Sequence, residues 1–135
     1  MSAASDYLEN KLLDHTLRNT AYTQPSNLYL GLFKNDSGNA ATNLEAGTLT
    51  DEVSGGSYAR ETVAFAAASS GSAATNATVT FTTATANWGT ITHVAVMDAS
   101  TSGNVLFWGA VTTSKTIESG DTFQVSSGNL TISLA

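Results

Sequence analysis

The sequence predicts an all-β fold, an antiparallel β-sandwich or jelly roll of about eight strands with one N-terminal α-helix. Charged residues make up only 12% of the 135 residues, and Ser, Thr, Gly and Ala take their place. Short runs of β-branched and aromatic residues are separated by turn formers at regular intervals, as in sandwiches and barrels. Residues 87 to 111 contain two such runs around the polar turn 98 to 104, in which Gly103 can take a positive φ. This pattern predicts a central β-hairpin.

The predicted helix covers residues 6 to 18, where the apolar residues recur at helical spacing: Leu8, Leu12, Leu13 and Leu17. Asp6 as N-cap and Glu9 three residues later form a plausible capping box, and Asp14 with Arg18 can form an i,i+4 pair. We expect the helix to end near residue 19. Its apolar face either packs on the protein's own sheet, which we favour, or docks on a partner.

The strands follow the helix. Residues 28 to 34 are apolar on both faces, which predicts a central strand covered on both sides. Residues 35 to 57 are rich in Asn, Ser, Gly and acids and predict a long loop, a feature that is usually functional or mobile. The closing strand is predicted at residues 129–134, with one face buried: Leu130, Ile132 and Leu134. The other predicted strands cover residues 58–65, 77–82, 91–97, 105–111, 115–118 and 122–125.

Composition limits the class of protein. We expect a single domain over 1–135, with the sandwich starting near residue 28, because this length can bury a core without disulfides. The formal charge is −6 and the five basic residues form no cluster able to neutralise phosphates, so we expect no nucleic-acid partner. The N-terminal stretch has acidic residues early and no long apolar run, so we expect neither a signal peptide nor a membrane partner, and synthesis in the cytoplasm.

Catalytic, metal and cofactor sites are not expected. His15 and His93 lack a partner at metal-ligand spacing, and no nucleophile motif such as G-x-S-x-G occurs. His93 is predicted to be a partly buried, hydrogen-bonded imidazole on one strand face with Ile91, Ala95 and Met97. The sequence therefore predicts a protein that is not an enzyme and that has no cofactor.

The acidic loop and the tryptophans are the candidate interaction features. The loop carboxylates lack the spacing of a calcium loop, so the loop is either solvated or an arm laid along a neighbouring subunit. The tryptophans border the hairpin, where large aromatics usually close a sandwich core; a sugar-binding platform is the alternative. The candidate interface residues are Leu8, Leu12, Asp36, Glu45, Asp51, Glu52, Trp88 and Trp108.

Several motifs carry a resemblance to a known family. They are LYLGLF (28–33), EVSGGSYAR (52–60), NWGTITHVAVMDA (87–99) and GNVLFWGAV (103–111), followed by Lys115, Ile117 and Gly120-Asp121. In this order they resemble a family of small bacteriophage proteins usually labelled tail fibre or virion structural proteins. The likeness covers most of the chain and includes its helical opening, SDYLENKLLDHTLRNTAY.

The resemblance implies a non-enzymatic structural protein of the virion. A small β domain with an N-terminal helix is also similar in build to capsid cement or decoration proteins. The chain has no shaft or heptad repeat, so its length favours a cement protein on the capsid exterior, with the major capsid protein and copies of itself, as a dimer or trimer, as partners. A tail fibre or tail-tip component that contacts the host is the alternative, and a carbohydrate-binding module is the third.

Overall fold

The computed structural model describes residues 2–134 and shows an antiparallel sandwich. Its main layer is a five-stranded sheet, in which each strand pairs antiparallel with its neighbours. In spatial order the strands are β1 (Ala3–Ala4), β7 (Val105–Ile117), β6 (Gly89–Met97), β2 (Leu28–Phe33) and β3 (Glu61–Val63). The predicted hairpin is the centre of this sheet, and β2 is an interior strand as predicted.

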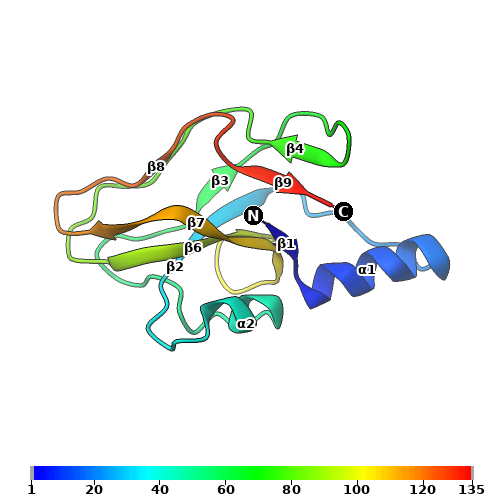
Figure 1. Ribbon diagram of the computed structural model, residues 1–135, viewed down its shortest axis with the longest axis horizontal. Coiled ribbons are helices and arrows are strands. Elements are labelled where there is room, and N and C mark those ends of the chain that lie inside the picture. Colours follow the sequence, from blue (N-terminus) through cyan, green and yellow to red (C-terminus); the bar gives the residue numbers. More distant parts are fainter. Residues whose placement is uncertain (1, 135) are drawn as a thin grey trace.

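The second layer consists of two short antiparallel pairs. They are β4 (Ser72–Ala74) with β9 (Thr131–Ser133), and β5 (Val79–Thr80) with β8 (Gln124–Val125). This layer covers one face of the main sheet, and the helix α2 (Ala40–Glu45) covers the other (Figure 1). The helix α1 (Asp6–Leu17) lies at one end of the sandwich. The all-β sandwich with an N-terminal helix is therefore confirmed.

Two apolar cores hold these layers together. The core between the sheet and the short pairs contains Trp88, Phe81 and Ile91, each at most 2% exposed. The core between the sheet and α2 contains Phe33, Leu44, Ala95, Met97 and Val105. Strand β2 contributes Leu30 and Leu32 to the first core and Phe33 to the second, which explains why its sequence is apolar on both faces.

Ser5, and not the predicted Asp6, is the N-cap of α1. The Ser5 hydroxyl accepts a hydrogen bond from the Leu8 amide at 3.3 Å and donates one to the Val105 carbonyl. The Ser5 amide also donates to the Leu106 carbonyl at 2.9 Å. The capping box prediction is wrong because Ser5 continues the pairing of β1 with β7 and so fixes where the helix begins.

The predicted acidic loop 35–57 contains a helix that the sequence analysis missed. In α2, Ala40 and Leu44 are 1% exposed and pack toward the main sheet. Burial of this apolar pair outweighs the low helix propensity of the surrounding Asn, Thr and Gly residues.

Several strand boundaries also differ from prediction. The two strands predicted at 105–111 and 115–118 form one strand, β7, whose pairing with β6 shifts between Ile91 and His93. Because this irregularity changes which side of the sheet each residue faces, Ile91 enters the first core while Ala95 and Met97 enter the second. The prediction that His93 shares a face with Ile91 is therefore wrong. The short strands β1 and β4 were not predicted.

The two ends of the described chain lie side by side (Figure 1). The Ser133 amide donates a hydrogen bond to the Ser2 hydroxyl at 3.2 Å. Leu134, predicted to be buried, is 54% exposed. Within residues 2–134, no helix has the length and hydrophobicity needed to span a membrane.

Candidate functional site

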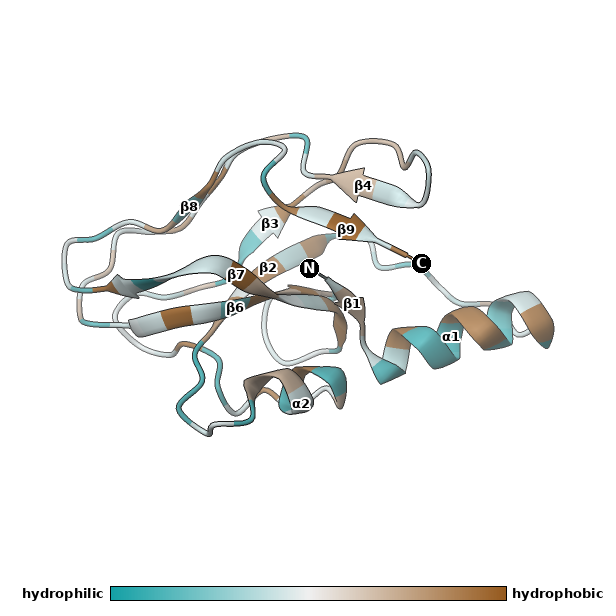
Figure 2. Ribbon diagram, viewed as in Figure 1, coloured by the Kyte–Doolittle hydropathy of each residue, from teal (hydrophilic) through white to brown (hydrophobic). Residues whose placement is uncertain are grey.

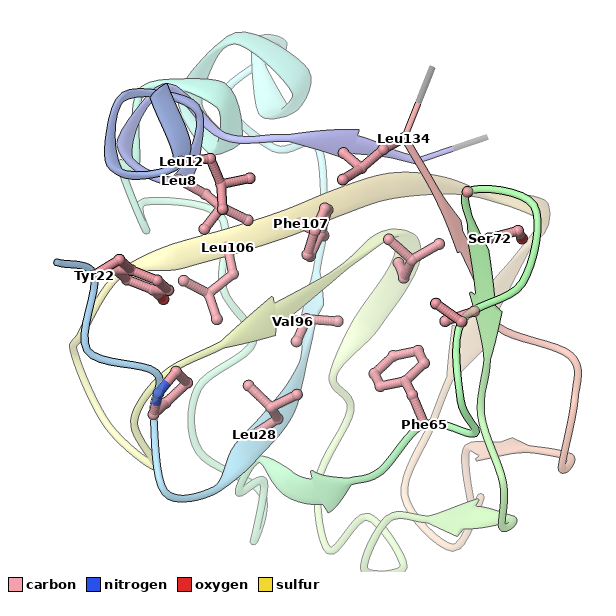
Figure 3. Close-up of a pocket in the computed structure, with 15 residues that line it drawn as sticks. Leu8, Leu12, Tyr22, Leu28, Phe65, Ser72, Val96, Leu106, Phe107 and Leu134 are labelled. Atoms are coloured by element: carbon pink, nitrogen blue, oxygen red, sulfur yellow. The ribbon is translucent and has the colours of Figure 1, made fainter. Parts of the chain in front are cut away.

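The main surface feature is a groove at the end of the sandwich where α1 lies (Figure 3). We call it the apolar groove. Its volume is about 410 Å³, and apolar side chains form nearly all of its wall. They come from α1, the main sheet and the β4–β9 pair, and include Leu12, Leu28, Phe65, Phe107, Ile132 and Leu134. Trp88 and Phe81 belong to the core between the two layers and do not line the groove.

Helix α1 places leucines on two sides. Leu8 is 4% exposed and packs with Ala4 and Leu106, and the half-buried Leu12 joins the same cluster. This part of the helix packs on the protein's own sheet, as we favoured. Leu13 and Leu17 are 55% and 74% exposed, and α1 contains both hydrophobic and hydrophilic stretches (Figure 2). Exposed apolar residues grouped in this way are typical of interaction surfaces.

An acidic cluster lies between α1 and α2. The carboxylates of Asp6, Glu9 and Glu45 offer oxygens that all lie within 4.8 Å of one another. Glu45 also accepts a hydrogen bond from the Trp108 indole at 2.6 Å, which fixes the α2 end of the cluster on the sheet. Asp6 and Glu9 are exposed in the first turn of α1, where carboxylates interact favourably with the helix dipole.

A buried polar network occupies the β2–β3 edge of the sheet. The Arg60 side chain is 3% exposed and donates to both carboxylate oxygens of Glu52 at 2.7 Å. Its remaining nitrogen donates to the carbonyls of Ala99 and Ser102 at 2.7 and 2.8 Å. Burial lowers the pKa of Arg60, but the hydrogen bonds and charge of Glu52 outweigh it, so the net shift is upward. Arg60 therefore holds the β6–β7 turn against the body of the protein.

Tyr58 extends this network to β2. Its hydroxyl accepts a hydrogen bond from the Leu32 amide at 3.0 Å and donates one to Glu52 at 2.9 Å. Burial, followed by the negative charge of Glu52, raises the pKa of Tyr58 strongly. The hydroxyl stays neutral, so it can donate to Glu52 while it accepts from the Leu32 amide. This satisfies the amide although β3 pairs only with Leu28 to Leu30 of β2.

Four of the predicted interface residues serve the fold in this structure. Asp51 is buried and accepts hydrogen bonds from the Ser37 hydroxyl and amide at 2.5 and 3.0 Å, which lower its pKa. Trp88 is 2% exposed and donates to the Gly56 carbonyl at 2.9 Å. Leu8 of α1 packs with Ala4 and Leu106, and Glu52 pairs with Arg60. These four side chains have contacts within the fold, and their contact with a partner stays a prediction.

The other four predicted interface residues lie at the surface or partly so. Leu12 borders the apolar groove, Glu45 and Trp108 form the hydrogen-bonded contact between α2 and the sheet, and Asp36 pairs with Lys34 at 2.9 Å. Their contact with a partner stays a prediction. His93 is half-buried and hydrogen-bonded to the Thr92 hydroxyl at 2.8 Å, as predicted for the ring.

The sequence analysis missed most of the apolar groove. Phe65 and Ile132 line it together, although 67 residues separate them in the chain and no local pattern links them. The exposed leucines were visible in the sequence, because Leu13 and Leu17 extend the helical apolar pattern beyond the one face that a sheet can cover.

The fold and this surface describe a small β-sandwich with an N-terminal helix, an apolar groove and exposed leucines. Residues 3–133 match the family model described as podophage GP4 fiber I protein gp80, and the chain belongs to this family of phage fibre proteins. The match covers α1 and every strand, so the resemblance inferred from the motifs is confirmed. No curated protein matches the chain. Family membership gives the coarse role of a structural protein of the virion.

Proposed function

We propose that the protein is a non-enzymatic building unit of a phage fibre on the tail side of the virion. The family match over residues 3–133 carries this proposal, since it covers the whole sandwich and not one motif. It favours the tail fibre alternative over the cement role that length alone suggested. The exposed leucines of α1 and the apolar groove support a protein that works in an assembly.

Capsid cement is the second candidate. The observation that favours it is the compact β-sandwich with an N-terminal helix, a build similar to that of capsid cement or decoration proteins. A compact unit of this size suits a protein that binds many equivalent positions on a shell.

Copy number separates the two roles. Virions would be purified, and this protein would be quantified against the major capsid protein by mass spectrometry with isotope-labelled peptide standards. The fibre proposal expects a small, fixed number of copies per particle. One copy for each capsid subunit, or for every few subunits, would overturn it and support the cement role.

Location gives a second readout on the same particles. Gold-labelled antibodies raised against the purified domain should label the tail end of intact virions. Labels spread over the capsid surface would contradict the fibre proposal. Tailless heads prepared from the same stock serve as the control, because they should lose the protein only if it belongs to the tail.

A further inference from the structure

We propose that α1 joins copies of this chain head to tail, with Leu13 and Leu17 of one copy seated in the apolar groove of the next. This inference goes beyond the proposed function, since it names a contact of the chain with itself. It rests on the two sides of α1, on the groove beside the helix and on the distribution of charge around the helix.

Helix α1 is apolar on two opposite sides. An α-helix turns about 100° per residue, so Leu13 and Leu17 point about 140° and 180° away from Leu8. Leu8 is buried on the protein's own sheet, whereas Leu13 and Leu17 are 55% and 74% exposed. The helix therefore cannot place its outer leucines in its own groove. A second copy offers an apolar surface that can cover them.

No side chain of the described residues fills the apolar groove. Its volume of about 410 Å³ falls in the range of sites that bind apolar groups. The walls come from three elements whose partly buried side chains, such as Phe65, Phe107 and Ile132, remain accessible from one side. Leu134 stands at the rim and is 54% exposed. Removing both leucine surfaces and these walls from water favours association.

The charges around α1 are complementary on its two sides. Asp6 and Glu9 lie within about 40° of Leu13 around the helix axis, and Glu45 of α2 adds a third carboxylate beside them. Lys11 lies about 60° from Leu8, the side that faces the groove, whereas the charge of Arg18 is paired with Asp14 at 3.4 Å. The outer side of α1 is therefore acidic near its first turns, and Lys11 flanks the groove side. In a head-to-tail contact the acidic side of one copy meets Lys11 of the next.

The geometry sets the kind of assembly. The exposed leucines and the groove are different surfaces on different sides of α1, so the contact is heterologous. Each copy offers one of each surface, and repeated contacts close into a ring or continue as a filament. A two-fold dimer would use the same surface twice and does not match this arrangement.

The first experiment measures the mass of the full chain by sedimentation velocity over a wide concentration range. The wild type should associate beyond the 13.9 kDa monomer. The double variant Leu13→Glu/Leu17→Glu should weaken association about tenfold or more, because two apolar contacts become charged. The control Thr113→Glu, on an exposed position of β7, should associate as the wild type does. Circular dichroism and thermal melting would confirm that each variant is folded.

The second experiment tests the head-to-tail geometry. The groove variant Ala68→Glu/Leu134→Glu changes two exposed groove-lining positions and keeps the outer leucines. Each double variant alone should associate at least about tenfold more weakly than the wild type. Mixed together, they should form a one-to-one dimer that grows no further, because only the leucines of the groove variant and the groove of the leucine variant remain intact.

The third experiment tests the charges. Lys11→Glu should weaken association several-fold, and the swap Lys11→Glu/Glu9→Lys should restore it, since the swap again places opposite charges across the contact. A swap that associates no better than Lys11→Glu alone would contradict the proposed charge pairing.

Several results would overturn the proposal. They are a wild type that stays monomeric at every concentration, double variants that associate as the wild type does, or a mixture that gives no dimer. If the wild type is monomeric but cross-links through the groove to another structural protein in virions, that protein is the occupant and the self-contact is wrong. The copy number and location of the protein in virions do not enter these measurements, so failure of the fibre proposal would be recognised separately.

Discussion

At the scale of single residues, Arg60 makes contacts that the sequence around it does not predict. It pairs with Glu52 from the segment beside β2 and holds two carbonyls of the β6–β7 turn. Glu52 lies eight residues before Arg60 in the sequence, whereas Ala99 and Ser102 lie about 40 residues beyond it. Because the guanidinium is almost fully buried, breaking its ion pair costs more free energy of unfolding than breaking an ion pair exposed to water.

Arg60→Ala should therefore lower the free energy of unfolding by about 3–5 kcal/mol, because Glu52 would be left as an unpaired, mostly buried carboxylate. Urea denaturation followed by tryptophan fluorescence measures this loss. Lys34→Ala is the matched control, since its partner Asp36 is 72% exposed and the pair should contribute less than about 1 kcal/mol. An equal loss in both variants would show that burial does not strengthen the Arg60 network.

At the scale of elements, α1 depends on its first contact with the sheet. Ser5 caps the helix, bonds to the β7 carbonyls of Val105 and Leu106, and so determines the direction in which the helix leaves the sandwich. The 12-residue helix has little stability of its own in water, and its attachment relies on Ser5 and the small cluster around Leu8.

Ser5→Ala should lower the free energy of unfolding by about 0.5–2 kcal/mol, as expected for loss of an N-cap, and should speed hydrogen exchange mainly in the amides of α1. Denaturation gives the first quantity and exchange measured by mass spectrometry gives the second. Thr20→Ala removes an exposed hydroxyl just beyond α1 and serves as the control. Exchange that rises equally over the whole chain would contradict a local role for Ser5.

The elements differ in how far the sequence could predict them. The hairpin strands and α1 were predictable because their apolar residues repeat at the period of a strand or a helix. Helix α2 was not, since only Ala40 and Leu44 mark it and their burial depends on the sheet above them. The side of the sheet that Ile91 faces was predicted wrongly. The register of β6 against β7 shifts between Ile91 and His93, and the alternation of apolar and polar residues in the sequence does not reveal such a shift. The groove and the Arg60 network require contacts between distant segments, which no local pattern encodes.

At the scale of the whole molecule, two ionisable side chains make the free energy of unfolding depend on pH. Burial lowers the pKa of His93 below its ordinary value of 6.5, an effect larger than the opposing influence of Asp51. Hydrogen bonds from Ser37, opposed by burial, lower the pKa of Asp51 below 3.8. In both cases the unfolded chain binds its proton at a higher pH than the folded chain does, so protons favour unfolding.

The protein should therefore lose stability in two acid steps. The first begins as pH falls through 6.5, where the unfolded chain protonates the His93 ring while the folded chain still keeps this ring neutral. The second begins as pH falls below 3.8, and the contribution of Asp51 is lost as pH passes its lower folded pKa. Denaturation midpoints measured between pH 8 and pH 3 would show both steps. His93→Gln should remove the first step and Ser37→Ala should reduce the second, whereas a flat profile above pH 5 in the wild type would contradict the role of His93.

The neighbouring ends of the chain, joined by the bond between Ser133 and Ser2, make this domain portable. A unit whose ends meet at one place can be spliced into an exposed loop of another protein without stretching either partner. Inserted in this way, the sandwich would keep the arrangement of α1 and the apolar groove, because the hydrogen bond between Ser133 and Ser2 already holds the two ends together.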